Sequence, residues 1–326
     1  MVRPDSLYCR VDLPLRRAYH PIGFGLHLAT NSPDVIDAAD ECWRDYRPEF
    51  ACTPIEFRVM LEPEGGVAGP PTFRLQRNLL SVISDAHNFA VVDLPAQLAC
   101  VYVSKDTAAD HNLLRWFFLE SIAYTLLAQR YVAPLHAACV VRDGTGILLC
   151  GESGAGKSTL AFAAACAGWT FLSDDCTWLN ANSADATAIG KPHQVRFRDD
   201  APSLFARLAN HIVQTRPNGK IGIEVPMRTF PDLRTGLHCR IGGLAWLDRR
   251  PGARTAIVPI EAAEAIRQML NASSFDDKVD EMHFRATRRL LGVPARRLRY
   301  DSLEEGLSLL SEFGASIGLK TAGGAV

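Results

Sequence analysis

The chain has 326 residues, of which 48% are hydrophobic, and a formal net charge of −1, so it is long enough for one large or two ordinary domains. The balanced charge gives no electrostatic reason to expect nucleic acid or a membrane as partner, and no apolar run reaches membrane-spanning length. Nine cysteines without a C-x-x-C pair, and no signal peptide at the start, predict reduced thiols in a cytoplasmic protein.

A small α+β domain of unknown role is predicted for residues 1–110. Short β-type segments alternate with clusters of Pro, Gly, Asp and Asn, and one segment has helical spacing. Strands are expected at residues 24–29, 55–61, 73–80 and 89–94, and a helix at 35–44 with Ser32 or Asp34 as its cap. No motif that carries chemistry lies here, so a scaffold or oligomerisation role and a role in recognising an acceptor both stay open.

A long helix is predicted for residues 113–130, where apolar side chains recur at helical spacing. At this spacing Trp116, Phe117 and Phe118 are typical of a core face rather than of a ligand cleft. We expect this helix to pack on the sheet of a second domain that spans residues 111–320.

Two strands joined by a hairpin are predicted next. An apolar run at 137–141 is followed by Asp143-Gly144, a strong signal for a two-residue hairpin turn, and then by a second apolar run that ends at Cys150. The hairpin would bring His136, which precedes the first strand, near the far end of the second. On the residues alone, a histidine at a strand start is more often structural than catalytic.

The second strand leads into a nine-residue motif that fits G-x-x-x-x-G-K-[ST], the phosphate-binding loop. Its residues are Gly151, Glu152, Ser153, Gly154, Ala155, Gly156, Lys157, Ser158 and Thr159. Such glycines let backbone N–H groups surround an anion at a helix N-terminus, the lysine reaches the outer phosphates, and the serine hydroxyl holds Mg²⁺. An apolar strand before the motif and an apolar helix at 160–167 after it predict nucleoside-triphosphate binding; the alternative is a degenerate loop that binds nothing.

An acidic pair follows one helix later. Residues 169–172 are predicted to form a strand that ends in Ser173-Asp174-Asp175. In a right-handed strand–helix–strand unit, the pair and the loop would lie at the carboxyl ends of neighbouring strands. One carboxylate can then hold Mg²⁺ while the other accepts a proton from an attacking hydroxyl; an acidic pair of this kind is otherwise a turn or a helix cap.

The remainder of the chain is predicted to add further strands and helices to the second domain. Strands are expected at 177–179, 194–198, 221–225 and 242–247, helices at 203–208 and 259–270, and a last helix begins at the capping box Ser302 to Glu305. Six arginines without an acid, Arg285, Arg288, Arg289, Arg296, Arg297 and Arg299, form a basic stretch. It is either a solvated surface or a dock for an acidic protein or peptide.

Residues 133–180 resemble the bacterial HPr kinase/phosphorylase family. The resemblance rests on His136, the loop fifteen residues later, a short helix that ends at Gly168, and Ser173-Asp174-Asp175; the Asp-Asp pair followed by Trp178 is also similar to ATP-dependent phosphoenolpyruvate carboxykinase. The resemblance implies an α/β fold with the P-loop kinase core of these enzymes, next to a smaller α+β amino-terminal domain.

The resemblance also implies roles for individual residues. Lys157 and the backbone of residues 151–159 would bind the triphosphate of ATP, and Ser158 would ligate Mg²⁺. Asp174 would be the base that activates the acceptor hydroxyl, Asp175 would help to position the metal, and His136 would lie by the transferred phosphate.

The chain departs from the family in two places. The family usually carries Glu after the loop serine, where this chain has Thr159, and the later glycine- and arginine-containing signature has no counterpart. HPr as acceptor and the reverse phosphorolysis reaction therefore stay open, whereas the kinase reaction is expected. Some proteins of the larger HPr-kinase-like group phosphorylate a precursor peptide.

The sequence thus predicts an ATP- and Mg²⁺-dependent kinase that transfers the γ-phosphoryl group to a hydroxyl, first of all a serine of a protein or precursor peptide. A small-molecule hydroxyl is the second acceptor, and a nucleotide-dependent switch or binding protein is the alternative from another class. The family often forms hexamers, and a homo-oligomer is one of the expectations for this chain.

Overall fold

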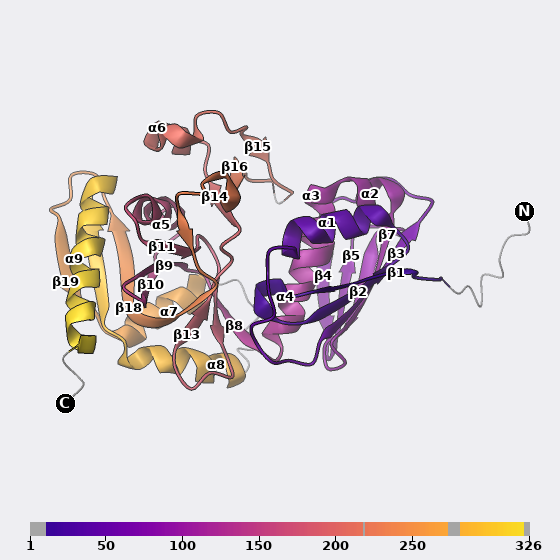
Figure 1. Cartoon of the computed structure of the whole chain (residues 1–326), viewed down its shortest axis with the longest axis horizontal. Coiled ribbons are helices and arrows are strands. Elements are labelled where there is room, and N and C mark those ends of the chain that lie inside the picture. The colour runs from indigo at the N-terminus through magenta and orange to yellow at the C-terminus, as the bar shows by residue number, and fades with distance from the viewer. Residues whose placement is uncertain (1–10, 218, 273–280, 323–326) are drawn as a thin grey trace, which may run out of the picture. The chain divides into compact units, whose positions relative to one another are not determined.

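The computed structural model describes residues 11–217, 219–272 and 281–322, and these residues form two compact units (Figure 1). Unit 1 contains the described residues up to Gln129 together with residues 216–220, and unit 2 contains the rest. Both units mix helices with sheets, so the predicted α/β class is confirmed at that level.

Unit 1 is built on a seven-stranded sheet with the order β1-β2-β3-β7-β6-β5-β4. The pairs β2·β3 and β3·β7 are parallel, and the other neighbours are antiparallel. The strands are β1 Leu15–Tyr19, β2 Leu26–Thr30, β3 Ile55–Glu62, β4 Thr72–Gln76, β5 Leu79–Ile83, β6 Phe89–Asp93 and β7 Leu98–Ser104. The helices are η1 Pro21–Gly23, α1 Pro33–Trp43, α2 Lys105–Ala109, α3 His111–Leu113, η2 Leu114–Glu120 and α4 Ser121–Ala128.

One turn in unit 1 divides a segment that the sequence left undivided, and a second turn precedes a strand that the sequence did not predict. The single strand expected at 73–80 is a hairpin of β4 and β5, because the chain turns at Arg77 with a φ of 54°. The strand β7 follows a second turn at Gln97, with a φ of 53°. The left-handed residues themselves are an arginine and a glutamine, and the turn-forming residues of these segments are their neighbours Asn78 and Pro95.

The helix expected at 113–130 is present as α3, η2 and α4 in succession, with a π-helical turn in η2. It belongs to unit 1, where ion pairs of His111 and Arg115 with Glu41, at 2.7 and 3.0 Å, join it to α1. The side-chain amide of Gln97 also donates a hydrogen bond to the carbonyl of Leu126. The first unit therefore ends at Gln129, whereas the sequence suggested a boundary near residue 110.

Unit 2 contains a large mixed sheet with the order β17-β11-β9-β10-β18-β13-β12-β8, and β20 pairs with both β18 and β19. Its strands are β8 Val132–Leu135, β9 Ala138–Arg142, β10 Thr145–Cys150, β11 Thr170–Ser173, β12 Thr177–Asn180, β13 Thr187–Ile189, β17 Arg234–Thr235, β18 His238–Arg249, β19 Ala256–Pro259 and β20 Ala295–Tyr300. A three-stranded sheet contains β14 Gln194–Phe197, β15 Gln214–Thr215 and β16 Ile221–Pro226. The helices are α5 Lys157–Cys166, α6 Ala201–Leu204, η3 Ala206–Leu208, η4 Met227–Thr229, α7 Ala262–Ala272, α8 Glu281–Arg288, η5 Arg289–Gly292 and α9 Leu303–Ala322.

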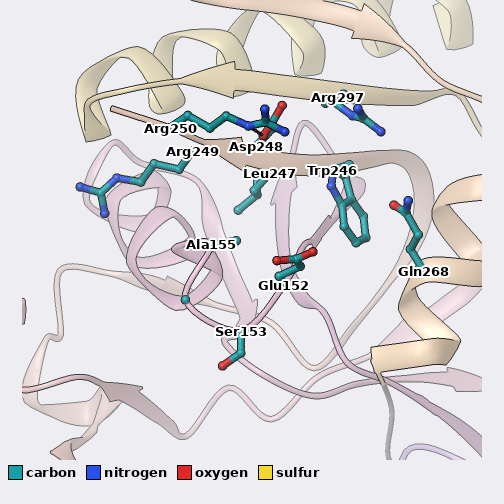
Figure 2. Close-up of a pocket in the computed structure, with 11 residues that line it drawn as sticks. Glu152, Ser153, Ala155, Trp246, Leu247, Asp248, Arg249, Arg250, Gln268 and Arg297 are labelled. Carbon is teal, nitrogen blue, oxygen red and sulfur yellow. Dashed lines mark hydrogen bonds and ion pairs between the residues drawn. The ribbon is translucent and has the colours of Figure 1, made fainter. Parts of the chain in front are cut away.

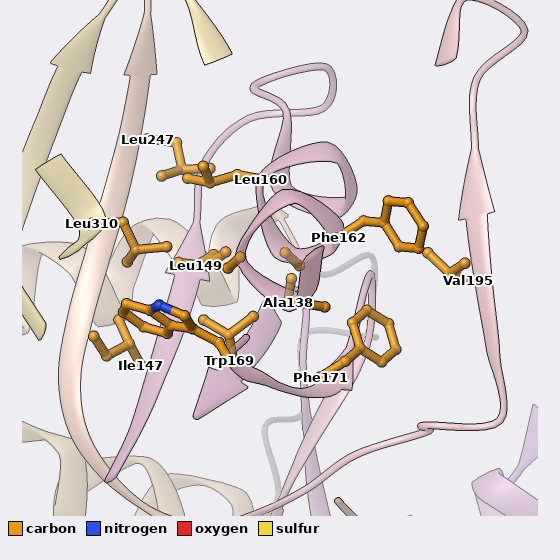
Figure 3. Close-up of a cluster of buried hydrophobic side chains, with 14 of the residues drawn as sticks. Ala138, Ile147, Leu149, Leu160, Phe162, Trp169, Phe171, Val195, Leu247 and Leu310 are labelled. Atoms are coloured by element: carbon orange, nitrogen blue, oxygen red, sulfur yellow. The ribbon is translucent and has the colours of Figure 1, made fainter. Parts of the chain in front are cut away.

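Successive side chains of β10 point to opposite faces of the sheet, so the core of unit 2 has two layers. Ile147 and Leu149 point into a cluster with α5 and α9 (Figure 3), and Leu148 and Cys150 point into a second cluster with α7 and α8. Every one of these four side chains is at most 1% exposed, and burying an aliphatic side chain contributes about 1.5–3 kcal/mol. The strand that leads into the loop is therefore fixed from both faces.

The predicted hairpin is confirmed, and it changes the order of the strands near the site. Asp143 and Gly144 form the turn with φ values of 49° and 76°, and β9 pairs antiparallel with β10. β9 also pairs antiparallel with β11, so it lies between β10 and β11. The two strands that carry the loop and the acidic pair are thus parallel but not neighbours, contrary to the expectation for a simple strand–helix–strand unit.

The ends of α5 and α9 follow the signals in the sequence, whereas Ser32, the residue before α1, makes no side-chain capping hydrogen bond. After α5 the chain turns at Gly168, with a φ of 90°, and the N–H of Trp169 donates to the carbonyl of Ala164. At the start of α9, Ser302 and Glu305 form the predicted reciprocal capping box with bonds of 3.2 Å. Within the described residues, no helix is long and apolar enough to span a membrane, and the eight cysteines found there are free thiols.

Candidate functional site

The glycine-rich loop, residues 151–156, joins β10 to α5 in a conformation that needs glycine. Gly151, Gly154 and Gly156 all have positive φ, at 154°, 91° and 92°. A Cβ at Gly151 would also lie 2.9 Å from the Cβ of Ala155, closer than such atoms approach in proteins. The loop therefore curls over the N-terminus of α5 and turns its backbone toward the place where an anion would bind.

Lys157 is the first residue of α5 and is only 6% exposed. Its ammonium donates hydrogen bonds to the carbonyls of Gly151 and Glu152, at 2.8 and 3.2 Å. Burial lowers the pKa of Lys157, against an opposing effect from the nearby Asp175 carboxylate. The cation is thus held inside the curl of the loop.

The structure brings Asp174 next to the loop. The hydroxyl of Ser158, in the first turn of α5, donates to the backbone carbonyl of Asp174 at 3.2 Å. The Asp174 carboxylate is 7% exposed and accepts a 2.6 Å hydrogen bond from the N–H of Arg196 in β14. Burial, reinforced by the charge of Asp175, raises the pKa of Asp174 to about 6.

Asp175 lies on the open side of the same turn, with 55% of its side chain exposed. His136, between β8 and β9, approaches it with Nδ1 at 3.4 Å from Oδ1. The antiparallel pairing of β9 with β11, in which Cys139 is opposite Ser173, brings His136 to the acidic pair. Among the described residues, no group of three or more His, Cys, Asp or Glu side chains could hold a metal ion by itself.

Arg196 in β14 and Arg198, directly after β14, have different environments. Arg196 forms a 2.7 Å ion pair with Glu224 of β16 and is largely covered. Arg198 is exposed, and its Nη2 lies 3.0 Å from the point where a Cβ of Gly154 would be. Arg198 is therefore the arginine of this segment that lies beside the loop.

The six arginines of the basic stretch do not form one surface. In α8 the side chains of Arg285 and Arg288 are exposed. Arg289 donates to the carbonyls of Asn180 and Ala181, at 2.9 and 2.8 Å. Arg296, Arg297 and Arg299 lie on β20, where Arg297 pairs with Glu264 and Arg299 with Asp248. Most of the stretch thus has partners inside the protein.

Two further side chains lie near the loop or the acidic turn, although no motif in the sequence predicted them there. The hydroxyl of Tyr300, at the end of β20, donates to the carbonyl of Ala155 at 3.3 Å. Lys191 is buried beside the acidic turn, where its charge partly offsets the burial that raises the pKa of Cys176 to about 12. These residues follow the motif by tens to more than a hundred positions, so only the fold brings them to it.

A cavity of about 450 Å³ adjoins the loop (Figure 2), and the residues that line it include neither Asp174 nor Asp175. It is lined by Glu152 to Ala155 of the loop, by residues 246–250 at the end of β18, by Gln268 of α7 and by Arg297 of β20. It lies at the carboxyl ends of the parallel strands β10, β18 and β20, where ligands bind in α/β sheets.

These features define an α/β protein with a glycine-rich loop, a buried carboxyl group near it and an adjoining cavity. The family model described as SynChlorMet cassette protein ScmC matches residues 98–190 of the chain. A solved structure titled Hpr(Ser) kinase/phosphatase, from Coxiella burnetii, is 14% identical, with a TM-score of 0.31 over 58% of this chain and 95% of that one. None of the curated proteins matches the chain.

Proposed function

We propose that the protein is a kinase that transfers the γ-phosphoryl group of ATP to a hydroxyl, on a P-loop core of the HPr kinase and phosphoenolpyruvate carboxykinase type. One observation carries the proposal: the Ser158 hydroxyl, directly after the glycine-rich loop, donates to the backbone carbonyl of Asp174, which places this buried aspartate beside the loop. A protein that only binds nucleotide needs the loop and a metal ligand. A second carboxylate kept from water beside the loop is what proton transfer from an acceptor needs.

The raised pKa suits Asp174 to that task. A base whose pKa is about 6 is ionised at neutral pH, yet takes a proton more readily than an ordinary aspartate. In the proposed step the acceptor oxygen forms a bond to the γ-phosphorus while the bond from that phosphorus to the bridging oxygen breaks. The hydroxyl proton passes to Oδ of Asp174, and ADP leaves with the electrons of the broken bond.

Charge neutralisation would come from the loop. Lys157 exchanges its bonds to the carbonyls of Gly151 and Glu152 for phosphate oxygens, while the loop N–H groups and exposed Arg198 stabilise the remaining charge. The oxygens of Ser158 and Asp175 are hard ligands of the kind that Mg²⁺ prefers, and Mg²⁺ commonly uses one or two protein oxygens together with phosphates. When bound there, the ion would neutralise phosphate charge.

His136 would orient the acidic turn. Its Nδ1 lies 3.4 Å from Asp175 Oδ1, so it restrains the more exposed carboxylate at the edge of the site. The acceptor that we propose is a serine of a protein or precursor peptide. The exposed Arg285 and Arg288 of α8 are the part of the basic stretch that remains open to an acidic segment of such a partner.

The test follows the γ-phosphate. Purified protein is incubated with Mg²⁺, γ-labelled ATP and fractionated extract from the cells that make it, beside the variants Asp174→Asn and Asp143→Asn. Asp143 lies in the exposed hairpin turn, so its variant is a matched control. Label on a protein, peptide or small molecule, kept by the control and lost with Asp174→Asn, supports the kinase. Release of free phosphate alone, at equal rates in all three proteins, would leave a nucleotide-binding switch instead.

A further inference from the structure

The cavity beside the loop has one wall made of three side chains from different elements. Trp246 of β18 and Arg297 of β20 are direct neighbours in the parallel register, and Gln268 comes from α7. Figure 2 shows Gln268 projecting from its helix toward Trp246, with Glu152 of the loop on the near side of both. The wall therefore offers one aromatic ring with two polar groups at its side.

A single carboxylate oxygen connects the two polar groups. Glu264 Oε1 accepts from Gln268 Nε2 at 3.4 Å and from Arg297 Nη2 at 3.3 Å. These bonds fix which end of the Gln268 amide faces the carboxylate. They also leave Gln268 Oε1 and Arg297 Nε buried, and neither atom has a hydrogen-bond partner within the part of the chain that the structure describes. Burying such groups unpaired destabilises the protein, so a ligand that pairs with them gains affinity.

The charges around the cavity are nearly balanced. Asp248 accepts from Arg250 at 2.6 Å and from Arg299 at 3.2 Å, and Arg297 is paired with Glu264. Burial alone would raise the pKa of Asp248, but the two arginines outweigh it and lower the pKa. Of the arginines that line the cavity, Arg250 and Arg297 pair with carboxylates and Arg249 donates to the backbone carbonyl of Asp301. Since each of them has a partner within the protein, the cavity suits an uncharged ligand part better than an anion.

We propose that this cavity binds the adenosine part of the nucleotide, with the ring of Trp246 against the base. Gln268 Oε1 and Arg297 Nε would then recognise the base by hydrogen bonds. The proposal rests on the nucleotide binding proposed above. About 450 Å³ lies within the range of about 300–1,000 Å³ of ligand pockets. The base meets the two atoms after a rotation of each side chain, and both atoms gain the partner that they lack.

The order of donor and acceptor favours adenine. Adenine has its N6 amino donor beside an acceptor nitrogen on both edges, N7 on one and N1 on the other. The acceptor Gln268 Oε1 with the donor Arg297 Nε can therefore match either edge. Guanine offers two acceptors, O6 and N7, on its major-groove edge, so only one of its edges can match. The ribose hydroxyls would meet the carboxylates of Glu152 and Asp248, which line the same cavity.

A phosphoryl acceptor fits this cavity less well. The residues that line it include neither Asp174 nor Lys157. An acceptor bound there would therefore not contact the proposed base. A nucleotide that spans the loop instead places its triphosphate over Lys157 and its base in the cavity, which leaves the side of Asp174 open for the acceptor.

The test compares ATP, GTP and inorganic tripolyphosphate by titration calorimetry with Mg²⁺, for wild type, Gln268→Met and Gln76→Met. Methionine keeps the length of glutamine and removes the acceptor; Gln76 is exposed on β4 of unit 1, so its variant is the control. We expect wild type to bind ATP at least tenfold more tightly than tripolyphosphate and more tightly than GTP. Gln268→Met should lose roughly three- to tenfold in ATP affinity, the worth of one hydrogen bond, with tripolyphosphate unchanged.

The outcomes separate this inference from the function on which it rests. If neither ATP nor tripolyphosphate binds to wild type, nucleotide binding itself fails. If both bind with equal affinity, or if Gln268→Met leaves ATP affinity unchanged, the loop binds the phosphates but the cavity does not bind the base. Equal affinity for ATP and GTP overturns the assignment of adenine, and loss of tripolyphosphate affinity in Gln268→Met points to a general structural defect instead of base recognition.

Discussion

Replacing Asp174 by asparagine is expected to stabilise the protein at neutral pH while it abolishes phosphotransfer. The carboxylate is buried, and its pKa rises from 3.8 to about 6 in the folded chain. A carboxyl group whose pKa is raised by folding binds its proton more tightly in the folded state, so its ionisation opposes folding. Asparagine has nearly the same shape, can still accept the hydrogen bond from the N–H of Arg196, and carries no charge.

The size and the pH dependence of this stabilisation follow from the pKa shift of Asp174. A difference of about two units corresponds to about 3 kcal/mol, at about 1.4 kcal/mol per unit. The destabilisation is absent below pH 3.8, grows as pH rises toward 6, and is complete above pH 6. Asp174→Asn should therefore be more stable than wild type by up to about 3 kcal/mol at pH 7.5, about half of that at pH 5, and nearly nothing at pH 3.5.

Urea denaturation at pH 5 and pH 7.5 measures this difference. Because the chain has two compact units, unfolding is followed by far-UV circular dichroism and by tryptophan fluorescence, and the variant is compared with wild type transition by transition. Asp143→Asn, in the exposed hairpin turn, serves as the control and should change stability by less than about 0.5 kcal/mol. A variant no more stable than wild type at pH 7.5, or a gain that is the same at both pH values, would refute the reasoning about burial.

Further predictions test the packing and the loop. With Asp174 as base, kcat/KM for phosphotransfer should fall tenfold per unit as pH drops below about 6; a flat profile down to pH 5 would argue for another base. Gly190→Ala should destabilise the protein by about 1–3 kcal/mol or more, because the new Cβ would lie 2.1 Å from the Leu172 carbonyl oxygen. Thermal melts measure this, and Gly292→Ala, whose Cβ meets open space, should leave the melting temperature unchanged. Arg198→Ala should weaken tripolyphosphate binding several-fold without changing the melting temperature, since its exposed side chain lies beside the loop; unchanged calorimetric affinity would contradict this.

The sequence predicted best those features that depend on neighbouring residues. The loop motif with its strand and helix, the turn at Asp143-Gly144 and the capping box at Ser302 each occupy a few consecutive positions, and each is found where it was expected. Local backbone chemistry decides such elements almost alone, because glycine, asparagine and capping side chains satisfy specific dihedral angles and hydrogen bonds.

Features that depend on tertiary pairing escaped prediction. β8, β13 and β7 are short or lie after turns without glycine, so their strand character appears only when partners are present. Periodicity placed the helix at 113–130 correctly but could not say which unit it packs in; contacts such as Arg115 to Glu41 decide that. The cavity residues Trp246 and Gln268 had no local signal either, since strand register and helix packing bring them to the loop.

Strand order also governs when the site can form during synthesis. The loop-bearing β10 is completed at Cys150, but its parallel partner β18 begins only at His238, and the Tyr300 hydroxyl that contacts the loop comes later still. The polypeptide leaves the ribosome from its N-terminus, and parallel pairings between distant segments form slowly. The loop motif therefore emerges long before the strands that support it. Only a nascent chain that has been translated beyond β20 can assemble the site, so products that terminate before Ala295 would carry the motif without the strand that supports the loop.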